Sequence, residues 1–160
     1  MKKFLRAVRL DASDASLLRA TGAAPDGAWV VSGGYAVCDL AAGFRCTPRC
    51  HCDDTFLQID APARCSIAEV VEIDAAEVPA LVDLLAAHLV GHWKAPSAAL
   101  AREIAEEEIA YTLELCETFA AGVWITVRRV PNSAGGAINE QAIDEQYDVY
   151  DRLMIGAHRL

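Results

Sequence analysis

The sequence predicts an α+β fold: an antiparallel sheet with a two-helix antiparallel hairpin packed on one face. Segments rich in Val, Ile and aromatic residues stand near both ends of the chain, whereas apolar residues recur at helical spacing in the middle. Few residues separate the two helical segments, which favours an antiparallel pair. This order of strands, helices and strands is typical of α+β domains. We expect the 160 residues, 1–160, to form a single domain.

The first half of the chain contains most of the predicted strands. Four segments have strand composition: 3–10, 28–38, 55–59 and 66–73. The pair Gly33-Gly34 predicts a bend or turn within the second of them. Residues 13–20 form either a helical turn or a loop, and residues 41–54 show no periodicity.

Two helices follow. Asp74 and Glu77 have the spacing of a capping box, but Pro79 in the first turn means that either this turn is irregular or the helix begins at Pro79. The first helix ends near Gly91, and a second one runs from Ser97 to about residue 120. The predicted buried positions of the first helix are Val78, Leu81, Val82, Leu85, Leu89 and Trp93, and those of the second are Leu100, Ile104, Tyr111, Leu115 and Phe119.

The end of the chain returns to strand character. Residues 123–130 form the clearest late strand, residues 131–136 form a turn, and residues 137–141 are a candidate partner strand. Residues 142–160 stay ambiguous, since Ile143, Tyr147, Tyr150 and Met154 have helical spacing while 147–150 also suits a strand.

Composition narrows the function classes. The net charge is −9 and no basic patch is evident, so nucleic acid and anionic membranes are poor partners. The N-terminal apolar run is broken by Arg6 and Arg9, so we expect no signal peptide. No stretch has the length of a membrane span, so we expect no transmembrane helix. We therefore expect a cytoplasmic protein whose six cysteines are thiols or metal ligands.

Three ionisable residues fall on predicted buried helix faces. His88 and His92 are four residues apart and share one face of the first helix, and Glu108 lies on the buried arc of the second. Two imidazoles and one carboxylate suit zinc or iron with an open coordination position, so His88, His92 and Glu108 are a candidate metal site. Alternatively the histidines form ordinary hydrogen bonds, and Glu108 pairs with His92 or with an arginine from a strand.

A second candidate site lies in the irregular segment. Cys46, Cys50, His51 and Cys52 supply soft ligands for zinc or an iron–sulfur cluster, although the spacing lacks the paired C-x2-C of strong zinc motifs. Arg45 and Arg49 would lower the pKa of these thiols and raise their reactivity. Alternatively, the segment is a polar loop without such a role. We expect Cys116 to be a small core residue.

Common nucleotide-binding and nucleophile motifs are missing from the sequence, which disfavours nucleotide-dependent chemistry and favours a non-catalytic protein. The segments FLRAVRLDASD (4–14), AAHLVGHWKAPS (86–97) and AEEEIA (105–110) resemble a family of small, functionally uncharacterised proteobacterial proteins. The resemblance implies an association with genes for molybdenum enzymes such as formate dehydrogenase and for a biotin/lipoate-ligase-like protein.

These observations lead to three functional hypotheses. The first is a cytoplasmic accessory or interaction protein with a protein partner, helping a metalloenzyme mature. The second is a metal-binding protein or metalloenzyme that uses His88, His92 and Glu108. The third is a zinc or thiol-redox site at Cys46, Cys50 and Cys52. A homodimer is also open, but no residue pattern argues for it.

Overall fold

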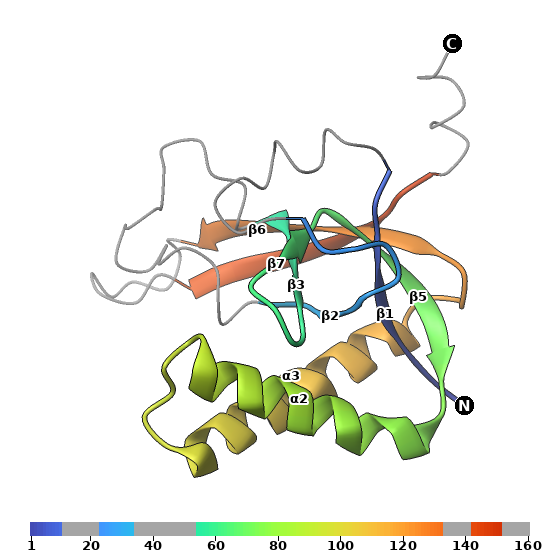
Figure 1. Cartoon of the computed structure of the whole chain (residues 1–160). Coiled ribbons are helices and arrows are strands. Elements are labelled where there is room, and N and C mark those ends of the chain that lie inside the picture. The colour runs from blue at the N-terminus through green and yellow to red at the C-terminus, as the bar shows by residue number, and fades with distance from the viewer. Residues whose placement is uncertain (11–22, 34–53, 133–141, 152–160) are drawn as a thin grey trace.

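The structure is a computed structural model that describes residues 1–10, 23–33, 54–132 and 142–151. One seven-stranded sheet dominates it, with a helical layer beneath the sheet in the view of Figure 1. The strand order is β4-β3-β2-β1-β5-β6-β7, and every ladder between these strands is antiparallel. The strands are β1 (Lys2–Val8), β2 (Trp29–Val31), β3 (Phe56–Gln58), β4 (Arg64–Cys65), β5 (Ile67–Ile73), β6 (Trp124–Asn132) and β7 (Ala142–Val149).

Most of the predicted strands are confirmed, with shifted ends. The long central ladder pairs β1 with β5 from Lys2↔Ile73 to Val8↔Ile67, and β6 and β7 form an eight-pair hairpin. The ambiguous segment therefore begins as a strand, β7, and its alternating burial over 144–148 fits a strand with one buried face. The short strand β4 was not predicted. The predictions for residues 13–20 and 137–141 lie outside the described residues.

The helical layer consists of a 3₁₀ turn, η3 (Ala75–Glu77), and two helices, α2 (Val78–Gly91) and α3 (Ala98–Glu117). Asp74 accepts a hydrogen bond from the Ala76 amide and caps the 3₁₀ turn, so the first turn is irregular and Pro79 stands where the α-helix starts. Ser97 caps α3 by accepting from the Leu100 amide at 3.0 Å. No helix in the described part of the chain has the length and apolar character to cross a membrane.

The predicted buried stripe is confirmed for α2 and only partly for the second helix, whose predicted Ile104, Leu115 and Phe119 are half-buried against the core clusters. Leu81, Val82, Leu85 and Leu89 are buried, whereas the buried residues of α3 are Ala101, Ala105, Ile109, Thr112 and Cys116. Leu100 and Tyr111, predicted to be buried, are 39% and 42% exposed. The small alanines bring the helix backbone close to its neighbours, which the larger side chains one position away would prevent.

The sheet is curled, and the helices contribute to two core clusters. Phe4 packs in a cluster with residues of α2 and of the first half of α3, whereas the adjacent Leu5 packs in a second cluster with Cys116. Neighbouring strand residues point to opposite faces, so α3 contributes to clusters on both faces of β1. The rings of Phe56 in β3 and Tyr147 in β7 lie 6.4 Å apart, although four strands separate these two in the sheet order. The curl thus brings β3 and β7 together over a shared core.

Candidate functional site

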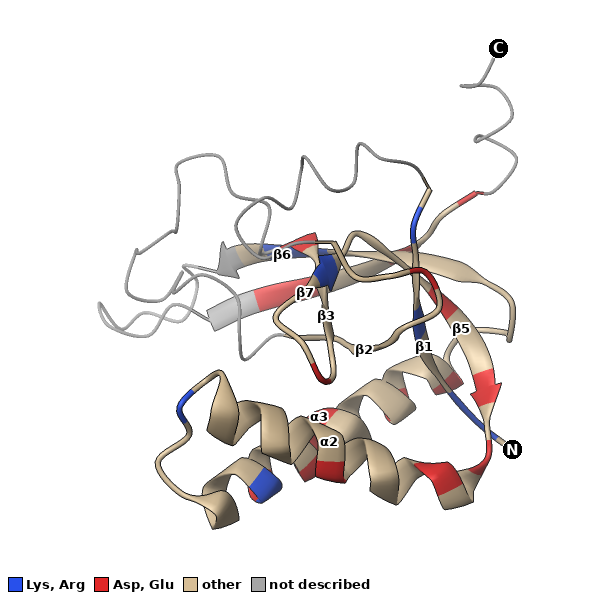
Figure 2. Ribbon diagram, in the orientation of Figure 1, with Lys and Arg blue, Asp and Glu red and all other residues tan. Residues whose placement is uncertain are grey.

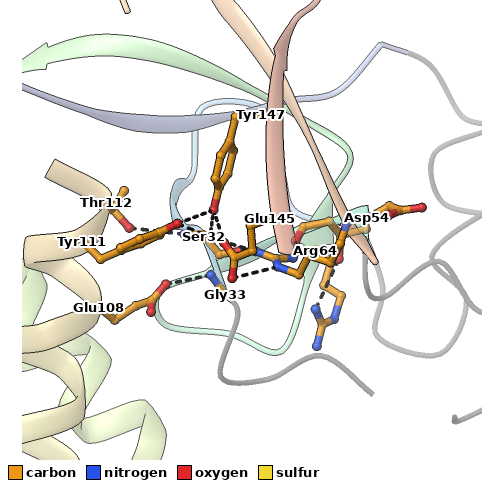
Figure 3. Close-up of polar contacts among 11 residues, drawn as sticks. Ser32, Gly33, Asp54, Arg64, Glu108, Tyr111, Thr112, Glu145 and Tyr147 are labelled. Atoms are coloured by element: carbon orange, nitrogen blue, oxygen red, sulfur yellow. Dashed lines mark hydrogen bonds and ion pairs between the residues drawn. The ribbon is translucent and has the colours of Figure 1, made fainter. Parts of the chain in front are cut away.

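A cluster of polar side chains lies where the ends of β2 and β3 meet β6, β7 and α3 (Figure 3). Its centre is Arg129 of β6, which is 2% exposed. One guanidinium nitrogen, Nη1, donates to the Thr55 carbonyl at 2.8 Å, and Nη2 donates to the Ser32 carbonyl and, at 2.8 Å, to the Ser32 hydroxyl. A buried guanidinium needs such partners because an unpaired buried charge is costly. Arg129 thereby ties β6 to β2 and β3.

Glu145 of β7 is the anionic partner of this arginine. Its Oε1 lies 3.4 Å from Arg129 Nε, and its Oε2 accepts hydrogen bonds from the hydroxyls of Ser32 and Tyr111, both at 3.2 Å, and of Tyr147. Burial acts to raise the pKa of Glu145, but the hydrogen bond from Tyr147 and the charge of Arg129 act against it, and the net pKa is lowered. Glu145 is therefore held as a carboxylate, and its hydrogen bond raises the pKa of Tyr147 in addition to burial.

Glu108 connects α3 to the end of β2. Its Oε1 accepts from the Gly33 amide at 2.8 Å, and one turn further along α3 the Thr112 hydroxyl accepts from the Ser32 amide at 3.3 Å. Gly33 has a φ of +81°, and a Cβ there would lie 2.8 Å from the Leu57 Cβ, so glycine is required at this contact. Burial, and secondarily the charge of Glu145, raise the pKa of Glu108, whereas the Gly33 amide opposes this rise.

A second buried arginine, Arg64 of β4, completes the cluster with its Nη1 donating to the Thr55 hydroxyl at 3.2 Å. Asp54 accepts from the Arg129 amide at 3.3 Å. Gly33, after β2, and Asp54, before β3, thus both bond to residues of the cluster.

This arrangement shifts the pKa values of two carboxyl groups in opposite directions: the pKa of Glu145 is lowered and that of Glu108 is raised. Two carboxyl groups with pKa values shifted apart can serve as acid and base in catalysis when a substrate can reach them. Here Ser32 is only 1% exposed, and the hydrogen bonds of the Arg129 guanidinium go to the chain's own carbonyls and to the Ser32 hydroxyl. The exposed edge of the cluster is Tyr111, whose hydroxyl also lies 3.3 Å from that of Tyr147. The cluster therefore acts mainly as a lock, a network of hydrogen bonds and one ion pair that joins the strands to α3.

The structure separates the predicted histidine–glutamate set. His88 and His92 lie together at the C-terminal end of α2, with parallel rings 5.3 Å apart, whereas Glu108 binds the Gly33 amide. Within the described ranges, no three His, Cys, Asp or Glu residues form a group that could hold a metal ion. His92 is exposed, contrary to its predicted place in the buried arc, because α2 ends at Gly91 and His92 is its C-terminal cap.

The second predicted site, Cys46, Cys50, His51 and Cys52, lies outside the described residues. Two other cysteines are described, Cys65 and Cys116, and both are buried thiols. Burial raises the pKa of the Cys116 thiol to about 12. Cys116 is fully buried in the second core cluster, so its expected role as a small core residue is confirmed.

Sequence reasoning did not identify Ser32, Arg129, Glu145 and Tyr147 as a cluster. The sequence of β6 did contain a signal. Ile125, Val127 and Arg129 are every second residue of the strand, so they share one face, and all three are buried. An arginine in register with two buried aliphatic residues predicts a buried charge that needs a partner. The partner itself could not be found, because Glu145 is brought opposite Arg129 only by the hairpin register.

Fold and cluster define a class: a small α+β protein whose curled antiparallel sheet is closed by a buried arginine–glutamate–tyrosine network and joined to a helical pair. Within that class, the chain belongs to DUF6505, a family of unknown function, whose family model matches residues 1–157. The expected membership of an uncharacterised family is thus confirmed, while its proteobacterial origin and its link to molybdenum enzymes stay predictions. No curated protein and no solved structure matches the chain.

Proposed function

We propose that this protein is a non-catalytic accessory protein that binds a basic partner protein through the outer face of α2. The observation that carries the proposal is an apolar, solvent-exposed helix face in an otherwise acidic layer. The polar cluster supports a non-catalytic role, because its buried groups bond to one another and to the chain's own backbone. The resemblance noted above suggests a metalloenzyme undergoing maturation as the partner.

The outer face of α2 is the set of exposed residues at helical spacing opposite its buried stripe. These residues are Ala80, Asp83, Leu84, Ala87, Val90 and Gly91. Leu84 is 45% exposed and Val90 is 44% exposed, and Asp83 is the one charged residue of this face. A helix that is apolar on both its buried and its exposed sides is typical of one that is covered on both.

The surroundings of this face are acidic. Residues 74–117 contain nine Asp and Glu and two Lys and Arg, which gives −7 of the chain's net charge of −9. Figure 2 shows that most of α2 is tan, while red acidic positions lie around it on the helical layer. Arg102 bridges the helices by contacting Asp83 at 2.8 Å and Glu106 at 3.2 Å. Because one arginine faces two carboxylates, the border of the face stays net negative.

Charge complementarity selects the occupant of this face. A second copy of the chain would bring two acidic layers together, which is unfavourable. A segment with apolar anchors flanked by Lys or Arg would instead bury Leu84 and Val90 and meet the acidic border. In such a helix-in-groove or helix-on-helix contact, apolar side chains spaced one helical turn apart determine which partner binds.

The proposal is tested by quantitative co-purification from cells that make the protein, with Leu84→Glu and Val149→Glu compared to the wild type. Val149 is an exposed apolar residue of β7, 63% exposed, and so is the matched control. We expect a partner lost with Leu84→Glu, kept with Val149→Glu and released by high salt, as charge screening requires. Equal recovery by both variants, salt-insensitive binding, or a homodimer abolished by Leu84→Glu would each overturn the proposal.

A further inference from the structure

The C-terminal end of α2 carries a pair of stacked imidazoles outside the polar cluster. The rings of His88 and His92 are 5.3 Å apart with an interplanar angle of 1°, because residues four apart lie above one another on a helix. The Trp93 ring meets both edge-on, at 4.8 Å from His92 and 6.4 Å from His88. Trp93 thus forms one wall of the pair.

One nitrogen of this pair has no hydrogen-bond partner among the described residues. The Nε2 atom of His88 is buried and forms no hydrogen bond with any described residue. A buried polar atom without a hydrogen bond is costly and is commonly explained by a ligand, an ion or water.

The charges around the pair favour a cation. The negative end of the α2 dipole lies at this terminus. Asp60, in the turn between β3 and β4, acts on His88 as a neighbouring negative charge. Glu108 contributes nothing here, since the Gly33 amide holds it in the polar cluster.

We propose that His88 and His92 bind one divalent transition-metal ion of the Ni²⁺, Zn²⁺ or Cu²⁺ class, with water in the remaining positions. Two imidazoles at i and i+4 can reach a single ion once the rings turn out of their parallel stacking so that a nitrogen of each points at it. These ions prefer imidazole, whereas Mg²⁺ and Ca²⁺ prefer oxygen ligands. Since only two protein ligands are assigned, the site keeps open positions. It does not depend on the proposed partner-binding face.

The test uses Ni²⁺ with the full chain carrying no affinity tag, followed by titration calorimetry and tryptophan fluorescence. We expect one equivalent bound by the wild type and quenching of Trp93 by the nearby paramagnetic ion. Because losing even an outer-shell group costs about 10-fold or more in metal affinity, His88→Gln and His92→Gln should each weaken binding by at least that factor. Trp93→Phe should keep the binding and lose most of the quenching.

His51→Gln is the matched control, because His51 belongs to the other candidate metal site, and it should bind Ni²⁺ as the wild type does. His92 is exposed, so His92→Gln decides the question even where His88→Gln perturbs folding. Absence of Ni²⁺ binding by the wild type would overturn the proposal. Binding that survives His92→Gln, or that is lost only in His51→Gln, would overturn it equally.

Discussion

Arg129 and Glu145 stand directly opposite one another in the β6–β7 ladder, with 3.4 Å between Nε and Oε1. The arginine side chain is fully buried, while the glutamate side chain is 23% exposed. The pair therefore joins the interior of the curled sheet to its edge, and the other donors of Arg129 extend the connection to β2 and β3.

Arg129→Met should destabilise the protein strongly. The change leaves Glu145 without its cation and the carbonyls of Ser32 and Thr55 without their donors. Breaking one side of a buried ion pair costs about 3 kcal/mol or more in the free energy of unfolding, measurable by urea denaturation. Arg128→Met is the control, since Arg128 is exposed and bonds only Gln146 within the described residues. Equal losses in the two variants would contradict the lock.

Glu108→Gln should change how stability depends on pH. Because burial raises the pKa of Glu108, the folded protein keeps a proton that the unfolded chain releases. The free energy of unfolding therefore falls as pH rises from about 4.3, the ordinary glutamate pKa, through the raised pKa of Glu108. Glutamine keeps an acceptor for the Gly33 amide and cannot ionise, so the variant should gain stability relative to the wild type across this range.

The control for this measurement is Glu107→Gln, one residue away on the exposed side of α3. The free energy of unfolding of Glu107→Gln should stay within about 0.5 kcal/mol of the wild-type value. A Glu108→Gln difference that is flat with pH, or that moves the other way, would show that Glu108 is not desolvated as described.

Tyr147→Phe should lower the stability of the protein more than Tyr111→Phe does. The Tyr147 hydroxyl bonds Glu145 and Ser32 inside the cluster, so its removal leaves buried groups short of a partner, at about 1–3 kcal/mol. Tyr111 is 42% exposed, and water can replace its hydroxyl. Thermal unfolding of both variants gives the comparison, and the reverse order would place the centre of the network at Tyr111.

Cys65 and Cys116 should resist alkylation in the folded protein. Cys65 is 4% exposed and Cys116 is fully buried with a pKa raised to about 12, so neither presents a reactive thiolate. A brief iodoacetamide pulse followed by peptide mass spectrometry should find both unmodified, and modified after unfolding in guanidinium chloride. Rapid labelling of Cys116 in the native state would contradict the packing of the second core cluster.

Much of the fold could be predicted from local patterns. The stripe from Leu81 to Leu89, the Ser97 cap and the strand that starts near Trp124 each depend on residues close in sequence. The fully buried positions of α3 could not be predicted, because several of them are alanines that fit against neighbours rather than the largest apolar residues of the helix. Glu108 was correctly singled out as an inward-facing charge, since the outward positions of Glu106 and Glu107 made it stand apart.

The site was less predictable than the fold. Ser32 is separated from Arg129 by 97 positions and from Glu145 by 113, so only the curled sheet brings them together. The proposed metal ligands illustrate the converse case: the spacing of His88 and His92 predicted their contact, whereas adding Glu108 required a tertiary contact that the fold does not make.

The outer face of α2 is tested most directly by photo-crosslinking in cells, with benzoylphenylalanine at Ala87 and, as a control, at Glu114 on the exposed side of α3. We expect a crosslink from position 87 alone, abolished by Leu84→Glu, to a peptide of another protein with apolar residues flanked by Lys or Arg. A crosslink to a second copy of this chain, to an acidic peptide, or of equal yield from both positions would contradict it.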